Sequence, residues 1–211
     1  MATKSGQFHK YKFPEGDLEG PTIVVGCREL VESIKPYLKQ TRTAVNVGAN
    51  VGVLVKMLAE HFDHVYAYEP DEANLQCMLD NVPETNVTLI WSAVGSEERM
   101  VSLKRTPINC GQTRVDASQG WGETPMQTLD SHPGLENVDL LVIDVEGFEL
   151  EVLKGATETI ARHKPVIVVE ENGLSEDYGI QTGASLDWLA DVHGYGVAGM
   201  QGHNYILEPQ D

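Results

Sequence analysis

Two glycines and one acid have the types and the spacing that suggest ligand binding. The segment AVNVGANVGVLV, residues 44–55, is apolar, turns at Gly48 and Gly52, and becomes apolar again. A strand that breaks on glycine before a helix brings its backbone close to a ligand. Glu69 lies 21 positions after Gly48, directly after the segment HVYAY. An acid at that distance, ending a second strand, can accept hydrogen bonds from both hydroxyls of a ribose.

The turn is poorly suited to a diphosphate. The dinucleotide fingerprint needs three glycines in the pattern GxGxxG, and here Asn50 stands at the middle position. The phosphate loop GxxxxGK[ST] is also absent, because the first lysine after Gly52 is Lys56. The pocket therefore favours S-adenosylmethionine, which joins adenosine to a cationic sulfonium, over a nicotinamide dinucleotide. The predicted cofactor contacts are Asn46, Gly48, Asn50, Gly52, Glu69, Pro70, Ser92 and Ala93.

The alternative is a purely structural role, in which the glycine turn only joins a strand to a helix and Glu69 is a surface acid. A nicotinamide-dependent oxidoreductase is a second alternative, disfavoured by the missing third glycine.

Acids also end two later strands. Asp144 and Glu146 follow the buried pattern VDLLVIDV, and Glu170 ends the pattern KPVIVVEEN. A positioned carboxylate can accept the proton that a hydroxyl loses when a methyl group is transferred to its oxygen. Asp144, Glu146 and Glu170 are therefore the predicted catalytic residues.

The same strand ends suggest a possible divalent cation. Asp144, Glu171 and Asn172 offer oxygen atoms at two strand ends, and hard cations prefer oxygen ligands. The alternative is that Glu146 caps a helix and that Glu170 and Glu171 bind loop backbone.

Strand and helix patterns alternate along the chain. Strands are predicted at 43–47, 64–70, 86–95, 138–145 and 164–172, helices at 27–40, 51–61, 71–82, 148–163 and 185–194, and a final strand pair within 195–209. This order indicates a parallel sheet covered on both faces, with one antiparallel strand added at an edge. Residues 96–137 are rich in turn-formers and are predicted to hold short added strands that shape the choice of acceptor. We expect an N-terminal arm and helix over 1–40 and the main domain over 41–211.

Four segments together resemble a known family. NVGANVG, AYEP, SAVGS and TLDSHPGLENVDLLVIDVEGFELEVLKGA resemble the FkbM family of S-adenosylmethionine-dependent methyltransferases, from about residue 43 to 171. The resemblance implies an α/β, three-layer Rossmann-like class I methyltransferase fold, with a seven-stranded, mostly parallel sheet, an antiparallel edge strand and a small β insertion. It also implies methylation of a hydroxyl on a small molecule or carbohydrate.

The sequence departs from this family at two positions. Asn46 stands where the family usually has an acid, and Val142 stands where it commonly has a lysine. Asparagine still accepts a hydrogen bond, so we expect weaker cofactor binding and not its loss. The alternative is a degenerate module that binds a protein partner without turnover.

Composition excludes several classes of protein. The net charge of -17 and the pI near 4.7 oppose binding to phosphate backbones, so no nucleic acid partner is expected. No apolar run approaches the roughly 20 residues of a membrane helix, and the N-terminus carries no secretory signal. The three cysteines form no CxxC pair, which agrees with a reducing, cytoplasmic location.

Overall fold

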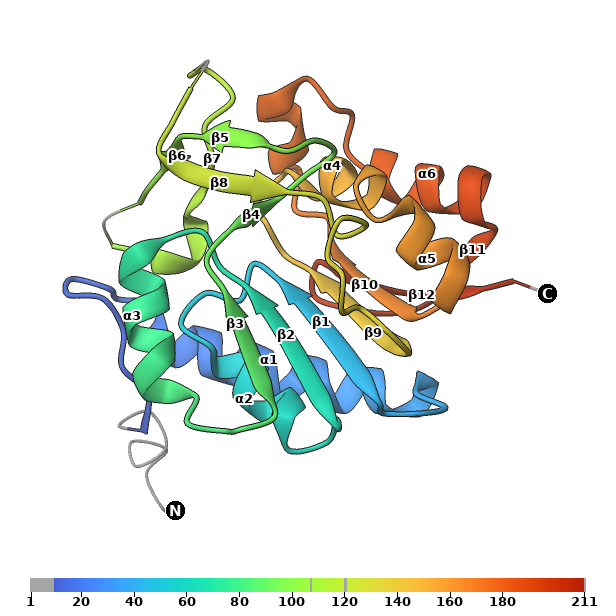
Figure 1. The fold of residues 1–211 in the computed structure, drawn as a ribbon, viewed down its shortest axis with the longest axis horizontal. Coiled ribbons are helices and arrows are strands. Elements are labelled where there is room, and N and C mark those ends of the chain that lie inside the picture. Colours follow the sequence, from blue (N-terminus) through green and yellow to red (C-terminus); the bar gives the residue numbers. More distant parts are fainter. Residues whose placement is uncertain (1–9, 107, 120, 211) are drawn as a thin grey trace.

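The chain folds around a seven-stranded sheet, whose strand order is β11-β12-β10-β9-β1-β2-β3 (Figure 1). The computed structural model describes residues 10–106, 108–119 and 121–210. The strands of this sheet are β1 (Thr43–Val47), β2 (His64–Tyr68), β3 (Val87–Ile90), β9 (Val138–Ile143), β10 (Val166–Glu170), β11 (Tyr195–Gln201) and β12 (Asn204–Pro209). Within this sheet β12 is antiparallel to both of its neighbours, β10 and β11. The predicted fold class is confirmed; the antiparallel strand lies one position in from the edge, and β11 is the edge strand.

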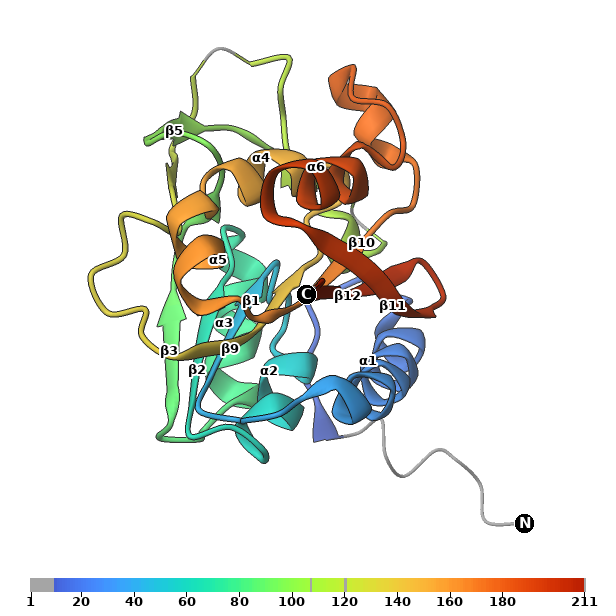
Figure 2. The same cartoon turned by 90° about the vertical axis from the view of Figure 1, so that its right-hand side faces the viewer.

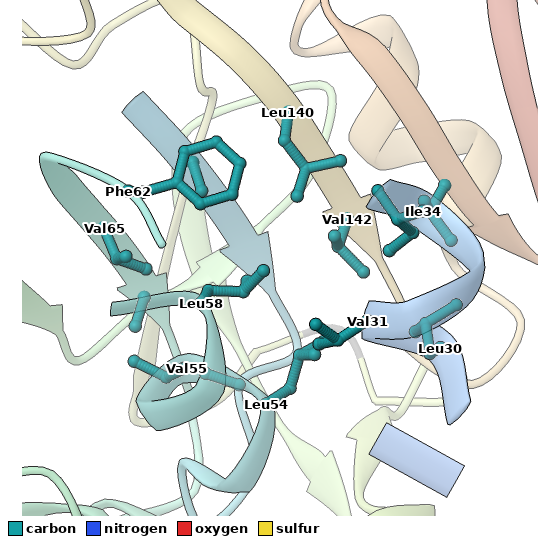
Figure 3. Packing of buried hydrophobic residues seen from close by; sticks show 14 of the residues in the cluster. Leu30, Val31, Ile34, Leu54, Val55, Leu58, Phe62, Val65, Leu140 and Val142 are labelled. Carbon is teal, nitrogen blue, oxygen red and sulfur yellow. The ribbon is translucent and has the colours of Figure 1, made fainter. Parts of the chain in front are cut away.

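Helices cover both faces of the sheet, which gives three layers (Figure 2). The α-helices are α1 (Gly20–Ile34), α2 (Val53–Ala59), α3 (Glu72–Asn81), α4 (Glu149–Lys154), α5 (Thr157–His163) and α6 (Ala184–His193). Helices α1, α2 and α3 pack on one face, in a core that includes Ile34, Leu58 and Val142 (Figure 3). Helices α4, α5 and α6 pack on the other face. Short 3₁₀ helices occupy Lys35–Tyr37, Cys110–Gln112 and Leu174–Tyr178.

The alternation of side chains along each strand decides which residues meet. On β1, Ala44 belongs to the α1 face, and Val45 and Val47 belong to the opposite face. Because side chains alternate with period two, Asn46 faces α1. The same alternation directs Asp144, Glu170 and Asn204 to the α1 face, at the ends of β9, β10 and β12.

The chain order reverses between β1 and β9. From β1 the sheet grows outward through β2 and β3, and it then continues on the other side of β1 with β9. In open α/β sheets ligands bind outside the carboxyl ends of strands at such a switch point. Here that point lies between Val47 and Asp144, whose backbone atoms are joined by a hydrogen bond of 3.0 Å.

The predicted strand over 86–95 is two strands. Strand β3 ends at Ile90, and after Trp91 and Ser92 a short strand β4 (Ala93–Val94) joins a different sheet. That three-stranded sheet has the order β4-β8-β5 and lies beyond the carboxyl ends of β1 and β2 (Figure 1). Its other strands are β5 (Arg99–Val101) and β8 (Thr124–Gln127), and β6 (Leu103–Lys104) pairs with β7 (Arg114–Val115).

Two predicted helices have different bounds. The helix over 148–163 is interrupted between α4 and α5, because Gly155 passes so close to Gly95 that a Cβ there would lie 2.0 Å from the Gly95 carbonyl oxygen. The N-terminal helix begins at Gly20, not at residue 27. In the described part of the chain no helix has the length and apolar character needed to cross a membrane.

Candidate active site

The turn after β1 is held close to β9. Gly48 has φ +85, and a Cβ at this residue would lie 1.7 Å from the carbonyl oxygen of Asp144. Only glycine combines that dihedral with that approach. Gly52, at φ +83, precedes α2 and packs on Met78 and Val82, where a Cβ would lie 2.6 Å from atoms of both side chains. The two glycines therefore fix the turn against β9 on one side and α3 on the other.

Glu69 is a buried carboxylate at the end of β2, 3% exposed. Its Oε2 accepts the N–H of Asn50 at 2.7 Å, and its Oε1 accepts the N–H of Asp71 at 2.9 Å. Burial raises the pKa of Glu69 to about 7, although these backbone amides oppose the shift. Because the Asn50 N–H is bound to Glu69, it does not point outward as a phosphate ligand. The geometry agrees with the absence of a diphosphate fingerprint.

A first cavity opens beside Glu69. It is lined by Val47, Gly48, Asn50, Tyr68, Glu69, Pro70, Asn74, Ser92, Ala93, Val94, Cys110, Gly111, Thr113, Arg114, Val115, Asp144, Val145 and Phe148. Six of the eight predicted cofactor residues are thus brought together at one cavity.

The other two predicted cofactor residues lie elsewhere. Gly52 lines neither this cavity nor the one beside it. It holds the turn by packing on Met78 and Val82. Asn46 lines a second cavity of about 260 Å³ on the α1 side of the turn. The two cavities share Gly48, Asn50, Gly111 and Asp144.

The three predicted catalytic acids form one cluster. One carboxylate oxygen each from Asp144, Glu146 and Glu170 lies within 4.8 Å of the others. Asn172 Nδ2 donates to Glu146 Oε2 at 3.1 Å and to Glu170 Oε2 at 2.8 Å. Asp144 lines both cavities, so the cluster stands where they meet.

The cluster holds protons more tightly than isolated carboxyls do. Surrounding protein raises the pKa of Glu146 and of Glu170 to about 7, and a neighbouring carboxylate adds to each shift. The pKa of Asp144 is raised by removal from water and then by the charge of Glu170 and a hydrogen bond with it. Groups with pKa values near neutrality can both accept and release protons at working pH.

The predicted set of cation ligands, Asp144, Glu171 and Asn172, is wrong, because Glu171 points away from the acidic cluster and Asn172 turns its NH2 group, not its oxygen, toward it. Glu171 alternates to the opposite side of β10 from Glu170, and its Oε2 accepts the N–H of Gly183 at 2.9 Å. The Oδ1 atom of Asn172 accepts the N–H of Leu174 at 3.0 Å. The alternative that these acids cap a helix or bind loop backbone is confirmed for Glu171 and is wrong for Glu146, because no side chain caps the start of α4. Glu149 accepts the loop N–H groups of Val145 and Gly147.

Comparison with protein families gives a match over most of the chain. The model of the methyltransferase FkbM domain matches residues 46–197. The chain belongs to the FkbM methyltransferase family. It is therefore a member of a family of S-adenosylmethionine-dependent methyltransferases. No curated protein shows significant sequence similarity to the chain.

Solved methyltransferases share the fold of this FkbM chain. A methyltransferase FkbM from Methylobacillus flagellatus is 19% identical, with a TM-score of 0.53, over 80% of this chain and 43% of that one. A putative O-methyltransferase from Klebsiella pneumoniae is 14% identical, with a TM-score of 0.55, over 94% and 84%. A precorrin-6y C5,15-methyltransferase from Geobacter metallireducens is 16% identical, with a TM-score of 0.53, over 94% and 92%. The chain spans less than half the length of the Methylobacillus protein.

The structure adds residues to the candidate site that the sequence does not predict. Asn74 on α3 donates to the Cys110 carbonyl oxygen at 3.1 Å and contacts Glu69 Oε1 at 3.4 Å. Cys110 and Arg114, from the added segment, form a wall of the first cavity, and Phe148 forms another part of it. The added segment thus lines the first cavity and, through Asn109 and Gly111, also the second. Cys110 and Arg114 lie in turn-rich sequence that carries no signal for this role, whereas Phe148 lies in the segment VIDVEGFELEV that carries the family resemblance.

Proposed function

We propose that the protein transfers the methyl group of S-adenosylmethionine to a hydroxyl group of a small molecule or sugar. The observation that carries the proposal is the meeting of two cavities at Gly48 and Asp144, one beside a buried acid and one lined by acids. When bound, the cofactor supplies an electrophilic methyl group on a positively charged sulfur. An acidic junction favours that charge.

The residues of the first cavity fit the nucleoside part of the cofactor. Glu69 Oε2 accepts one hydrogen bond, from the Asn50 N–H, and keeps a lone pair that can accept a ribose hydroxyl. Ala93 and Phe148 offer apolar walls for a purine ring, and Ser92, whose hydroxyl donates to the Ala93 and Pro125 carbonyls, holds that wall in place. Asn46 has both side-chain polar atoms unpartnered in the second cavity, and we assign it to the methionyl part.

We assign proton transfer to the acidic cluster of Asp144, Glu146 and Glu170. The acceptor hydroxyl loses its proton as its oxygen bonds to the methyl carbon, and a carboxylate with a pKa near 7 can accept that proton. Asp144 is our principal candidate because it lies at the junction, with Glu146 and Glu170 beside it. Holding the two reactants in line contributes on the order of 7–11 kcal/mol when the geometry is good.

The net charge of -17 supports a small acceptor and opposes a nucleic acid acceptor. Helix α1 forms one side of the second cavity, so we assign the N-terminal helix to the same functional unit as the domain over 41–211.

The test is calorimetric titration with S-adenosylhomocysteine, with NADH as the control. Micromolar binding of the first compound and none of the second is expected. Binding of NADH alone would contradict the proposal. The bound protein is then assayed with labelled S-adenosylmethionine against hydroxylated small molecules, and retained cofactor binding without transfer to any of them would indicate the degenerate module.

A further inference from the structure

Four residues of the first cavity are joined in a closed ring of hydrogen bonds. The Asn50 N–H donates to Glu69 Oε2 at 2.7 Å, and Asn50 Oδ1 accepts from Cys110 Sγ at 3.2 Å. The Cys110 carbonyl oxygen accepts from Asn74 Nδ2 at 3.1 Å, and the same Nδ2 donates to Glu69 Oε1 at 3.4 Å, which closes the ring. All four residues line the cavity, so the ring fixes the Glu69 carboxylate relative to the cavity wall.

Asn74 is the member of the ring that joins two distant parts of the chain. The NH2 group of an asparagine carries two hydrogens, so one group can donate to two acceptors. Here the acceptors are a carboxylate at the end of β2 and a backbone carbonyl of the added segment over 96–137. Asn74 is 2% exposed, and a buried acceptor that loses its donor is costly. The amide therefore holds both acceptors close to it.

The start of α3 places Asn74 for this role. Asp71 is the N-cap of the helix, and its Oδ1 accepts the N–H groups of Ala73 at 2.9 Å and Asn74 at 3.1 Å. Helical side chains lean toward the N-terminus of their helix, so Asn74 in the first turn reaches back to the end of β2. Asp71 also pairs with Arg105 of the added segment. That segment is therefore tied to the first turn of α3 at two points.

Cys110 is held by three separate segments. Its N–H donates to Asp17 Oδ2 at 2.8 Å, while Asp17 Oδ1 accepts the Gly20 N–H at the start of α1. Its carbonyl oxygen is bound by Asn74 and its thiol by Asn50. All three polar groups of this 8% exposed residue are thus bound. Cys110 is a fixed part of the cavity wall, and its link to Glu69 on the side of α3 is Asn74.

We propose that this ring orients Glu69 to bind the cofactor ribose, and that Asn74 is the positioning residue that closes it. The inference rests on the proposed function, in which Glu69 binds the ribose. Glu69 Oε1 accepts two protein donors, Asp71 N–H and Asn74 Nδ2, and Oε2 accepts one, so Oε2 is the oxygen with room for a ribose hydroxyl. Without the Asn74 donor, the carboxylate is free to rotate and the wall at Cys110 is released from it.

The experiment measures how much of the binding depends on the ribose hydroxyls. Calorimetry compares S-adenosylhomocysteine with its 2′,3′-dideoxy analogue, and the ratio of their dissociation constants is the preference for ribose. We expect the unaltered protein to bind S-adenosylhomocysteine at least tenfold more tightly than the analogue.

In Asn74→Ala, the preference for ribose should fall below threefold, because Glu69 is no longer held in the orientation that accepts a hydroxyl. A residue that only supported the fold would weaken both ligands equally and leave the preference unchanged. Retention of the full preference in a folded Asn74→Ala protein would overturn the proposal.

The matched control is Asn81→Ala on the same helix. Asn81 is also a buried asparagine, 4% exposed, and its Nδ2 donates to the carbonyl oxygens of Lys12 and Val51, each at 2.8 Å. Its loss should lower the unfolding temperature, as the loss of Asn74 should, but the preference for ribose should stay within twofold of that of the unaltered protein. An equal fall of the preference in both variants would assign the effect to the packing of α3 and overturn the proposal.

Should Asn74→Ala not fold, the ring is opened at Cys110 instead. Cys110→Ala removes the donor to Asn50 Oδ1, whereas Cys110→Ser supplies a hydroxyl that can donate in its place. The preference for ribose should fall at least threefold in Cys110→Ala and stay within twofold of the unaltered value in Cys110→Ser. Equal preferences in the two Cys110 variants would contradict a role of the ring.

Failure of the proposed function is distinguishable from failure of this inference. If the proposed function is wrong, S-adenosylhomocysteine does not bind the unaltered protein at all. If S-adenosylhomocysteine and its dideoxy analogue bind the unaltered protein equally, the cofactor is bound without a contact from Glu69 to the ribose, and the inference alone is overturned.

Discussion

Asn46 on β1 and Val142 on β9 are register partners, and both face α1. These are the two positions at which the sequence departs from the family pattern of an acid and a lysine. Because they are neighbours in the sheet, the two departures lie side by side, where the family resemblance implies an acid and a lysine. Val142 packs in the core near Ile34 (Figure 3).

We therefore predict that the two positions are energetically coupled. Asn46→Asp alone puts an unpaired carboxylate beside Asp144 and should lower the free energy of unfolding by about 3 kcal/mol at pH 8, and by less at pH 5, where it can be protonated. Val142→Lys alone should also destabilise the protein.

In the Asn46→Asp, Val142→Lys double variant, the loss should be smaller than the sum of the single losses by about 1–3 kcal/mol. Urea unfolding of all four proteins measures this coupling. Additive effects would show that the two side chains do not meet.

Glu69→Ala should weaken binding of S-adenosylhomocysteine by about 1–3 kcal/mol, the range for hydrogen bonds to a charged group. Calorimetry on the variant measures the change. Glu72→Ala is the control, since Glu72 is an exposed acid in the first turn of α3. Equal affinities for the Glu69 variant and the unaltered protein would mean that the ribose is bound elsewhere.

Stability should fall as pH rises from about 4.5 to above 7. In the folded protein the pKa values of Glu146 and Glu170 are about 7, against 4.5 for an unperturbed glutamate. Within that window the folded state holds more protons than the unfolded chain, so the free energy of unfolding decreases with pH. This contribution is fully present below pH 4.5 and is lost as pH passes through 7.

The side chain introduced by Glu146→Gln cannot ionise, and its amide oxygen can still accept a hydrogen bond from Asn172. The control is Glu158→Gln, which replaces an exposed acid in the first turn of α5. Between pH 5 and pH 8, urea unfolding should therefore show a smaller loss of stability for Glu146→Gln than for this control. An equal loss in both would contradict the raised pKa at Glu146.

The sequence predicts the parts of this site that local chemistry dictates. Gly48 and Glu69 were identified because a strand, a glycine turn and an acid at a fixed spacing form a local pattern. Glu171 was placed wrongly, although the alternation of Val166 and Val168 with Ile167 and Val169 assigns Glu170 and Glu171 to opposite faces.

Other features depend on contacts between distant segments. The break at Gly155 arises from its approach to Gly95, 60 positions earlier. The wall formed by Cys110 depends on Asn74 and on Asp17, whose Oδ2 accepts the Cys110 N–H at 2.8 Å. No pattern within a single segment encodes such contacts.

Gly48→Ala tests whether the turn after β1 joins the two cavities. The added Cβ would overlap the Asp144 carbonyl oxygen and would have to adopt φ +85, so the turn must move away from β9. We expect a loss of at least about 3 kcal/mol in the free energy of unfolding. Binding of S-adenosylhomocysteine should be lost, because Gly48 borders both cavities.

The matched control is Gly26→Ala in α1, where a Cβ meets nothing within 4 Å. Alanine in a helix interior is more favourable than glycine by about 1 kcal/mol, so this variant should be as stable as the unaltered protein or more stable. Chemical unfolding and calorimetry on both variants separate the two effects. A Gly48→Ala protein of normal stability that still binds S-adenosylhomocysteine would show that the contact between the turn and Asp144 does not hold the site together.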